Sequence, residues 1–272
     1  DNMPNIRTYT NFILIKIPIS LIILVCVFSI WPIPTTNAQS GITLESHTVI
    51  SEFPKGIRFN VITSGQSNII EIKMRFSKGS SNTSSYGYLE FEESTQVNGE
   101  YFLRTSTGNT YIPPGTSLTY HFEITDSNDN ILITEPQVFI YEDTRFNWED
   151  ITEGPITILF HGPIETRATL VGKAMIETLD NMGPLLGADI TEPIRVNLYN
   201  NSVEMLKALP PRSETIRTEL VTEGMAFPDI GMLLVLASGT RAKGTASHEL
   251  THILVHRATK DAFLPIPAWL NE

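Results

Sequence analysis

The sequence is nearly free of cysteine, since its 272 residues contain a single one, Cys26. Cys26 lies inside an apolar run, where a cysteine acts as a small hydrophobic side chain. One cysteine cannot form an intramolecular disulfide or a cysteine-rich metal site. The serine-hydrolase motif G-x-S-x-G is also absent. These two absences exclude disulfide-stabilised folds and disfavour nucleophilic catalysis by serine or cysteine.

Basic residues are also scarce, because 19 Lys and Arg stand against 30 Asp and Glu, a formal net charge of −11. This acidity disfavours nucleic acid and anionic membrane surfaces as partners. The rest of the composition is typical of a globular protein, with 41% hydrophobic and 18% charged residues. The chain is long enough for two domains of ordinary size.

The longest apolar run, residues 17–31, follows two basic side chains and precedes a stretch of small residues that ends at Ala38. This order is typical of a secretory signal peptide that is cleaved after Ala38. An uncleaved membrane anchor through residues 12–31 is the alternative interpretation, although the run is short for a span. Either interpretation of residues 1–38 predicts a secreted or extracytoplasmic protein.

Residues 41–143 show apolar side chains alternating with polar ones, the pattern of half-buried strands. Turn-forming residues cluster at 64–67, 78–81 and 113–115. We therefore predict a β-sandwich of the immunoglobulin or fibronectin type. Residues 126–130 resemble the start of a calcium loop, but Ile131 occupies the position that requires glycine, so we predict a hairpin turn there.

A polar segment at 142–150 follows, and its Phe146 and Trp148 are predicted to fix two domains together. Beyond it the pattern changes to alternating strands and helices, which predicts an α/β domain over 151–272. The expected strands are 156–161, 194–198 and 232–237. The expected helices are 164–182, stopped by Gly183-Pro184, and a second one that begins at Asn201 and ends at Pro210-Pro211.

An H-E-x-x-H motif runs from His248 to His252, in a segment free of Gly and Pro that predicts a helix over 245–260. On a helix, His248 and His252 lie one turn apart on one stripe and can bind the same zinc ion. Glu249 lies beside this stripe and can act as general base. An apolar face on the other side is expected to pack on a core, and it consists of Leu250, Ile253 and Leu254.

A catalytic zinc ion needs a third protein ligand, which here must be His, Asp or Glu once the leader is removed. The stretch Leu264–Glu272 contains P-x-W-L-N-E, and with the H-E-x-x-H motif it resembles the gluzincin metallopeptidases, closest to the peptidase MA-like families. In those families a Gly follows this Glu, and the present sequence ends at Glu272. The resemblance implies a Zn²⁺ cofactor, Glu272 as the third ligand, and residues 151–272 as the N-terminal half of a gluzincin catalytic domain.

The remaining histidines are interpreted as structural or solvated. His256 continues the motif's stripe but lies about 12 Å along the helix from His248, too far to share the metal. His47, His121 and His161 are isolated in strand-like segments.

We therefore predict a secreted zinc peptidase that hydrolyses peptide or protein substrates, with Glu249 as general base. Aminopeptidases of the related families carry a G-x-M-E-N segment whose Glu binds the substrate amine. The nearest stretch here, Glu223–Pro228, has Ala226-Phe227 at that point, which favours an endopeptidase. The alternative hypothesis is a non-catalytic surface protein that binds peptides or cell wall through a degenerate peptidase domain.

The leader yields a first prediction. When the protein is expressed with residues 1–38, it should leave the cytoplasm and begin at Gln39, because the apolar run directs export and the small residues allow cleavage. Mass spectrometry of the exported protein measures this directly. Retention of residues 1–38 in the exported form would support the membrane anchor instead.

Overall fold

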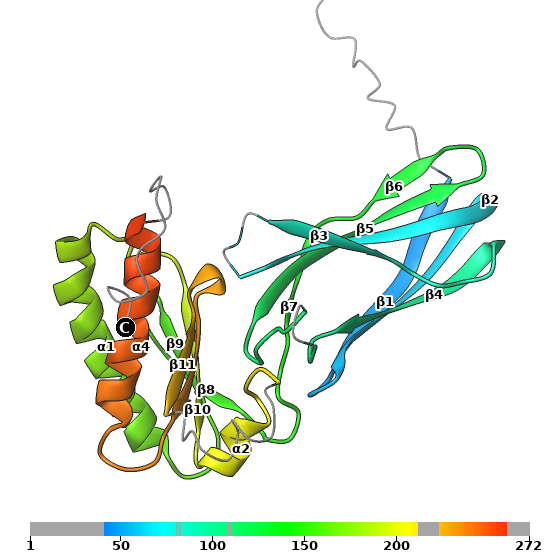
Figure 1. Cartoon of the computed structure of the whole chain (residues 1–272). Helices are drawn as coiled ribbons and strands as arrows, with labels where there is room; N and C mark the ends of the chain where they lie inside the picture. Colours follow the sequence, from blue (N-terminus) through cyan, green and yellow to red (C-terminus); the bar gives the residue numbers. More distant parts are fainter. Residues whose placement is uncertain (1–40, 80, 82, 108–109, 212–222, 260–272) are drawn as a thin grey trace, which may run out of the picture. The chain divides into compact units, whose positions relative to one another are not determined.

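A computed structural model describes residues 41–79, 81, 83–107, 110–211 and 223–259 (Figure 1). This part of the chain contains twelve strands and three α-helices, and the strands form one seven-stranded and one five-stranded sheet. Residues 1–40, with the expected leader, and residues 260–272, with Glu272, lie outside it. Among the described helices, none combines the length and the hydrophobicity of a membrane span.

The seven-stranded sheet is built around one long strand, β2 (Gly56–Lys78). The first half of β2 pairs with β1 and β4, and its second half pairs with β3 and β5, always antiparallel. Two short strands, β6 and β7, pair with β5. The bounds of these strands are β1 Ile42–Glu52, β3 Ser84–Tyr88, β4 Ser94–Arg104, β5 Ser117–Asp126, β6 Ile131–Ile133 and β7 Gln137–Ile140.

The prediction of a sandwich of two stacked sheets is wrong. Residues 64–67, interpreted as a turn, lie inside β2, and the register with β4 shifts there, between Ser64 and Ile69. An irregularity of this kind bends and twists a strand without ending it. The two layers therefore belong to one continuous sheet, a half-barrel, whose inner face buries residues such as Phe59, Met74 and Phe122.

The hairpin predicted in place of a calcium loop is confirmed. The Oδ1 atom of Asp126 accepts hydrogen bonds from the backbone N–H groups of Asn128 and Asn130, both at 2.9 Å. Asp129 adopts a left-handed conformation with φ 62°. Asp126 is buried and already bonded within its own turn, which joins β5 to β6.

The five-stranded sheet has the order β11-β12-β10-β9-β8. Its three central strands are parallel, and antiparallel strands lie at both edges. β8 falls in and just beyond the segment interpreted as a linker, and it pairs with the whole of β9. The bounds are β8 Glu149–Glu153, β9 Ile156–Phe160, β10 Ile194–Tyr199, β11 Gly224–Phe227 and β12 Met232–Leu236.

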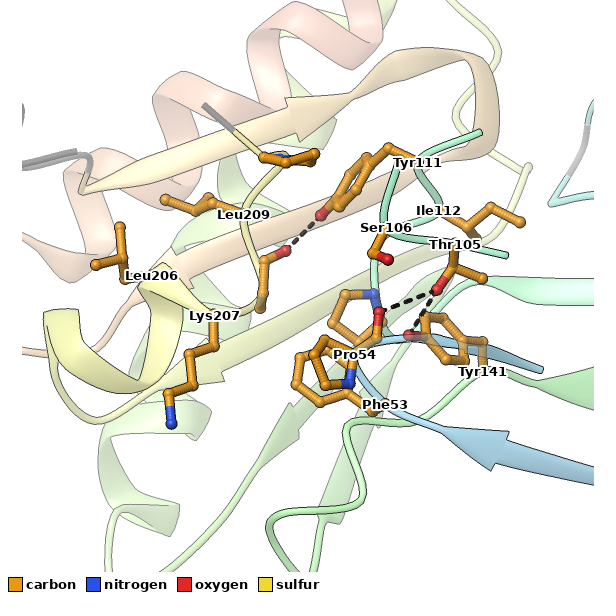
Figure 2. Close-up of a pocket in the computed structure, with 13 residues that line it drawn as sticks. Phe53, Pro54, Thr105, Ser106, Tyr111, Ile112, Tyr141, Leu206, Lys207 and Leu209 are labelled. Carbon is orange, nitrogen blue, oxygen red and sulfur yellow. Dashed lines mark hydrogen bonds between the residues drawn. The ribbon is translucent and has the colours of Figure 1, made fainter. Parts of the chain in front are cut away.

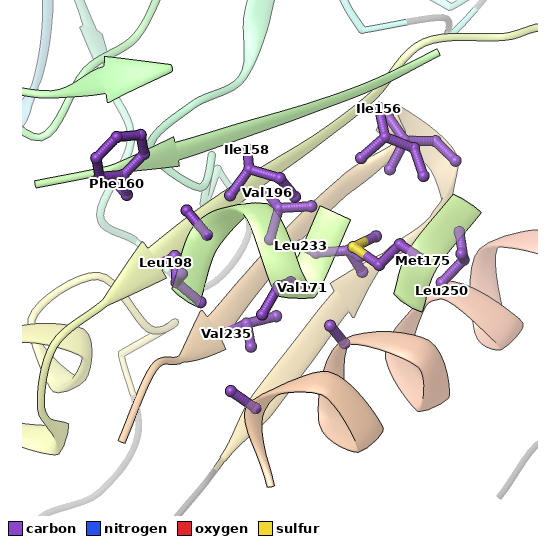
Figure 3. Packing of buried hydrophobic residues seen from close by; sticks show 14 of the residues in the cluster. Ile156, Ile158, Phe160, Val171, Met175, Val196, Leu198, Leu233, Val235 and Leu250 are labelled. Atoms are coloured by element: carbon purple, nitrogen blue, oxygen red, sulfur yellow. The ribbon is translucent and has the colours of Figure 1, made fainter. Parts of the chain in front are cut away.

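Two long helices, α1 (Glu165–Leu186) and α4 (Ala242–Thr259), pack on each other and on one face of this sheet. Their buried side chains meet those of the central strands in a single core (Figure 3). The predicted apolar face of α4 is confirmed, since its three side chains are fully buried: Leu250, Ile253 and Leu254.

α1 continues beyond the predicted stop at Gly183-Pro184 and ends at Leu186, with Gly187 as its C-cap at φ 68°. Pro184 lies in the last turn, and the chain closes with the Ala188 N–H donating to the Gly183 carbonyl at 3.0 Å. Gly183 is required there because an added Cβ would lie 2.2 Å from Ile190 Cγ2. The short helix α2 (Ser202–Leu206) begins as predicted, with Asn201 as its N-cap, but ends before the two prolines.

The predicted fold class, a sandwich followed by the α/β half of a gluzincin catalytic domain, is contradicted as a whole. The described chain is rich in β-structure, with a half-barrel sheet and antiparallel strands at both edges of the second sheet. The alternating pattern predicted the parallel strands and long helices correctly. It missed β8 and β11, the edge strands of the second sheet, because neither shows an apolar–polar alternation long enough to indicate a strand.

Phe146 and Trp148 pack on the face of the second sheet opposite α1 and α4, together with Tyr199. The Phe146 ring stacks on His161 at 4.0 Å between ring centroids, and His161 Nε2 lies 3.1 Å from Glu204 Oε2. His161 therefore has the structural role expected of it.

Candidate functional site

The helix α4 brings the two motif histidines together. The Nε2 atoms of His248 and His252 are 3.2 Å apart, and their ring centroids are 4.8 Å apart with the planes nearly perpendicular. His248 is exposed and His252 is half-buried, so this edge of the helix faces away from the core. The fully buried Leu250 and Leu254 on the other side fix the rotation of the helix that produces this orientation.

The spacing of the two imidazoles fits a zinc ion. Two nitrogens that each bind zinc at about 2.0–2.1 Å in tetrahedral geometry lie about 3.3–3.4 Å apart. The observed 3.2 Å, the length of a hydrogen bond between the two rings, is close to that value. His248 and His252 are therefore suited to act as two ligands of one metal ion.

Glu249 lies against the edge strand β11 rather than in solvent. Its carboxylate accepts a hydrogen bond from the backbone N–H of Ala226, and its side chain passes close to Gly224. Burial raises the pKa of Glu249, whereas the neighbouring His252 and His248 and the Ala226 N–H act to lower it. A raised pKa makes the carboxylate a stronger base, which suits a group that accepts protons.

Glycine at position 224 is what allows this approach. A Cβ added there would lie 2.6 Å from Thr245 Cγ2, 2.7 Å from Glu249 Cγ and 2.9 Å from Glu249 Oε1. Such distances are shorter than normal van der Waals contacts, so any side chain at 224 would displace the general-base candidate. The sequence of this stretch predicts only the lack of a carboxylate, and the roles of Gly224 and the Ala226 amide become apparent only in the structure. A glycine in a strand does indicate close approach of another group.

Two sets of contacts hold α4 in place. Ser247 Oγ accepts a hydrogen bond from Thr178 Oγ1 of α1 at 2.9 Å. In the last turn, the Arg257 guanidinium donates to the carbonyls of Asp189, Glu192 and Pro193 at 3.0–3.2 Å. These contacts join α4 to α1 and to the segment that precedes β10, on both sides of the motif.

The other predicted residues are placed as follows. His256 lies 3.2 Å from Asp229 Oδ1, measured from Nε2, so it forms a separate pair one turn beyond the motif. Glu272, the predicted third ligand, lies outside the described residues. Within the described ranges, no group of three or more His, Cys, Asp or Glu side chains has the arrangement of a metal site.

Comparison with known proteins does not show a family. No family model matches the chain, and no curated protein sequence matches it. Yeast LTA4 hydrolase in complex with bestatin is similar in structure at TM-score 0.30 and 10% identity, covering 88% of this chain and 48% of that one. BhCBM56, a carbohydrate-binding module, gives TM-score 0.25 and 11% identity over 36% of this chain and 95% of that one. Similarities this low assign neither fold family nor function.

A polysaccharide deacetylase from Bacillus cereus gives a third weak similarity, with TM-score 0.26 and 10% identity over 64% of this chain and 56% of that one. It adds no assignment either. The function of the chain must therefore be inferred from the geometry of the site.

A cavity of about 400 Å³ lies apart from the motif and is lined mainly by aromatic and aliphatic side chains (Figure 2). Burial raises the pKa of Tyr141 to about 12, and burial also raises the pKa of Tyr111, so both phenols stay neutral at physiological pH. Lys207 is the one charged side chain among its described lining residues. The cavity lacks a paired acid and base in this described lining, so the α4 motif remains the better candidate for chemistry.

The contact between Gly224 and Glu249 yields a second prediction. Gly224→Ala should lower the free energy of unfolding by about 1–3 kcal/mol, because the new methyl group overlaps Thr245 and Glu249. Gly244→Ala is the matched control, since a Cβ there meets nothing within 4 Å, and its stability should stay unchanged or rise by up to about 1 kcal/mol. Urea denaturation followed by circular dichroism compares the two. Equal stability of both variants would contradict the close packing at Gly224.

Proposed function

We propose that this protein is a zinc-dependent peptidase in which His248, His252 and Glu272 bind the metal and Glu249 is the general base. The observation that supports it most directly is the pair of Nε2 atoms 3.2 Å apart, with a half-buried carboxylate on the intervening turn. The combination provides two ligands and a base within one helical turn.

Each residue of the site would have a separate role in the proposed hydrolysis. Zinc, when bound, would supply a Lewis acid for the hydrolysis of an amide. Glu249 accepts a proton from the attacking water and later delivers it to the leaving amine. The Ala226 N–H orients one side of the carboxylate, and the absence of a side chain at Gly224 keeps room for it.

The edge strand β11 is a suitable surface for an extended peptide. The Glu223 carbonyl accepts from the Leu236 N–H at 2.8 Å, and the alternation of an antiparallel ladder turns the amides of Gly224 and Ala226 away from β12. The Ala226 N–H already donates to Glu249, so a peptide that adds to this edge would bond to the Gly224 backbone and pass beside Glu249. Addition through the backbone suits peptide and protein substrates with varied side chains.

Metal binding and chemistry should separate in mutants of the full chain. His252→Ala or Glu272→Ala should lose zinc and activity together, because each removes a ligand. Glu249→Gln should keep zinc while turnover falls at least about 10²-fold, because an amide cannot accept the proton. Elemental analysis and a peptide-hydrolysis assay measure the two properties.

His256→Ala is the matched control, since His256 lies on the same helix but pairs with Asp229, and it should keep both zinc and activity. If Glu272→Ala retains full zinc, the gluzincin ligand set is wrong. Zinc bound by the wild-type protein without hydrolysis of any peptide would favour the non-catalytic binding protein.

The cleavage mode follows from the composition of β11. Gly224–Phe227 contains no carboxylate, and the preceding Glu223 lies within 3.3 Å of Arg241 Nη1, so neither offers a free anion for a substrate amine. The enzyme should cut internal bonds, and N-acetylated peptides should be hydrolysed as fast as unblocked ones. Chromatography of the products distinguishes the modes. Faster release of free amino acids from the unblocked peptides would show an aminopeptidase.

A further inference from the structure

The outer face of the half-barrel carries an ordered set of aromatic and charged side chains. Residues directly opposite in antiparallel strands point to the same face. Tyr88 of β3, Lys73 of β2 and Glu123 of β5 form one such row. Tyr86, Arg75 and His121 form the next row on the same strands. We call this surface the tyrosine face, and it consists of Tyr86, Tyr88, Glu71, Lys73, Arg75, His121 and Glu123.

The side chains of both tyrosines are exposed to solvent. Tyr86 is 59% and Tyr88 49% exposed, and their ring centroids are 5.6 Å apart with the planes at 75°. Lys73 Nζ lies 5.5 Å from the Tyr88 centroid. Between them, Gly87 lies so close to Tyr101 that a Cβ would approach its ring to 2.3 Å. The backbone of β3 therefore lies close to the core, and both tyrosine side chains point outward.

The charged side chains beside the rings are held in fixed positions and balance each other. Glu123 lies 2.5 Å from Arg75 Nε and 3.5 Å from Lys73 Nζ, and Lys73 Nζ lies 3.4 Å from Glu71. Two cations thus face two carboxylates, so this surface has no net charge from them. A surface with balanced charges does not select a polyanion or a polycation.

Each row also places charged side chains directly beside its tyrosine, which differs from the centre of a protein–protein interface, where charges are depleted. A ligand that fits must have flat apolar patches for the rings and many hydroxyl groups for both carboxylates and cations. Sugar rings have this chemistry, because their C–H faces stack on aromatic rings and their hydroxyls both donate and accept.

We propose that the tyrosine face binds a neutral polysaccharide, with Tyr86 and Tyr88 stacking on sugar rings and the Lys73, Arg75 and Glu123 set bonding to hydroxyls. The binding does not depend on the zinc site. It would place the protein on a glycan surface.

Native gel electrophoresis of the full chain in gels containing a soluble β-glucan, a mannan, a xylan or polygalacturonate tests this. At least one neutral polysaccharide should retard the protein. Tyr88→Ala should weaken that affinity about tenfold, because the stacking surface is lost, whereas Tyr88→Phe should retain it. Ile50→Ala is the control, since Ile50 is 50% exposed on β1, outside the tyrosine face.

Both alanine variants change exposed side chains, and circular dichroism should show an unchanged fold. Retardation by none of the three neutral polysaccharides, or by polygalacturonate alone, would overturn the proposal. Equal retardation of the Tyr88→Ala and Ile50→Ala variants would overturn the proposal as well.

Discussion

The burial of one side of α4 determines the geometry of the candidate site. Leu250, Ile253 and Leu254 are inaccessible to solvent, packed against α1 and the central strands of the five-stranded sheet. Their burial contributes several kcal/mol, at about 1.5–3 kcal/mol for each side chain of this kind. Rotation of the helix would expose them, so the opposite edge, with His248 and His252, is held in one orientation. The direction in which the two imidazoles face is a consequence of this packing.

The second determinant is the backbone of the edge strand. β11 ends the sheet beside α4, and its outward amides lie where Glu249 can reach them. The carboxylate is half-buried between a backbone N–H and the space left by Gly224. This environment both orients the side chain and raises its pKa by burial. In the proposed function, an extended peptide would bind along this strand, next to the proposed base.

The half-barrel separates its two faces in a different way. The continuous strand β2 places Ile72, Met74 and Phe76 inside and Lys73 and Arg75 outside, through the strict alternation of strand side chains. The inner residues form the core of the sheet, and the outer ones align with Tyr86 and Tyr88 of β3. Strand pairing alone therefore aligns the aromatic and charged side chains of the tyrosine face. No pocket is needed to position them.

The sequence by itself determined the local features. Spacing of four places His248 and His252 on one helical stripe, the apolar positions identified the buried face of α4, and Met232–Leu236 was recognisable as a buried strand. The sequence alone could not predict strand pairing or close contacts between distant residues. The run at 64–67 has turn-forming residues, yet it lies inside β2, where Ser64 and Gly65 pair with β1 while the ladder with β4 is interrupted. The contact of Gly224 with Glu249 and the alignment of Tyr88 with Lys73 join residues distant in sequence, so only the tertiary structure decided them.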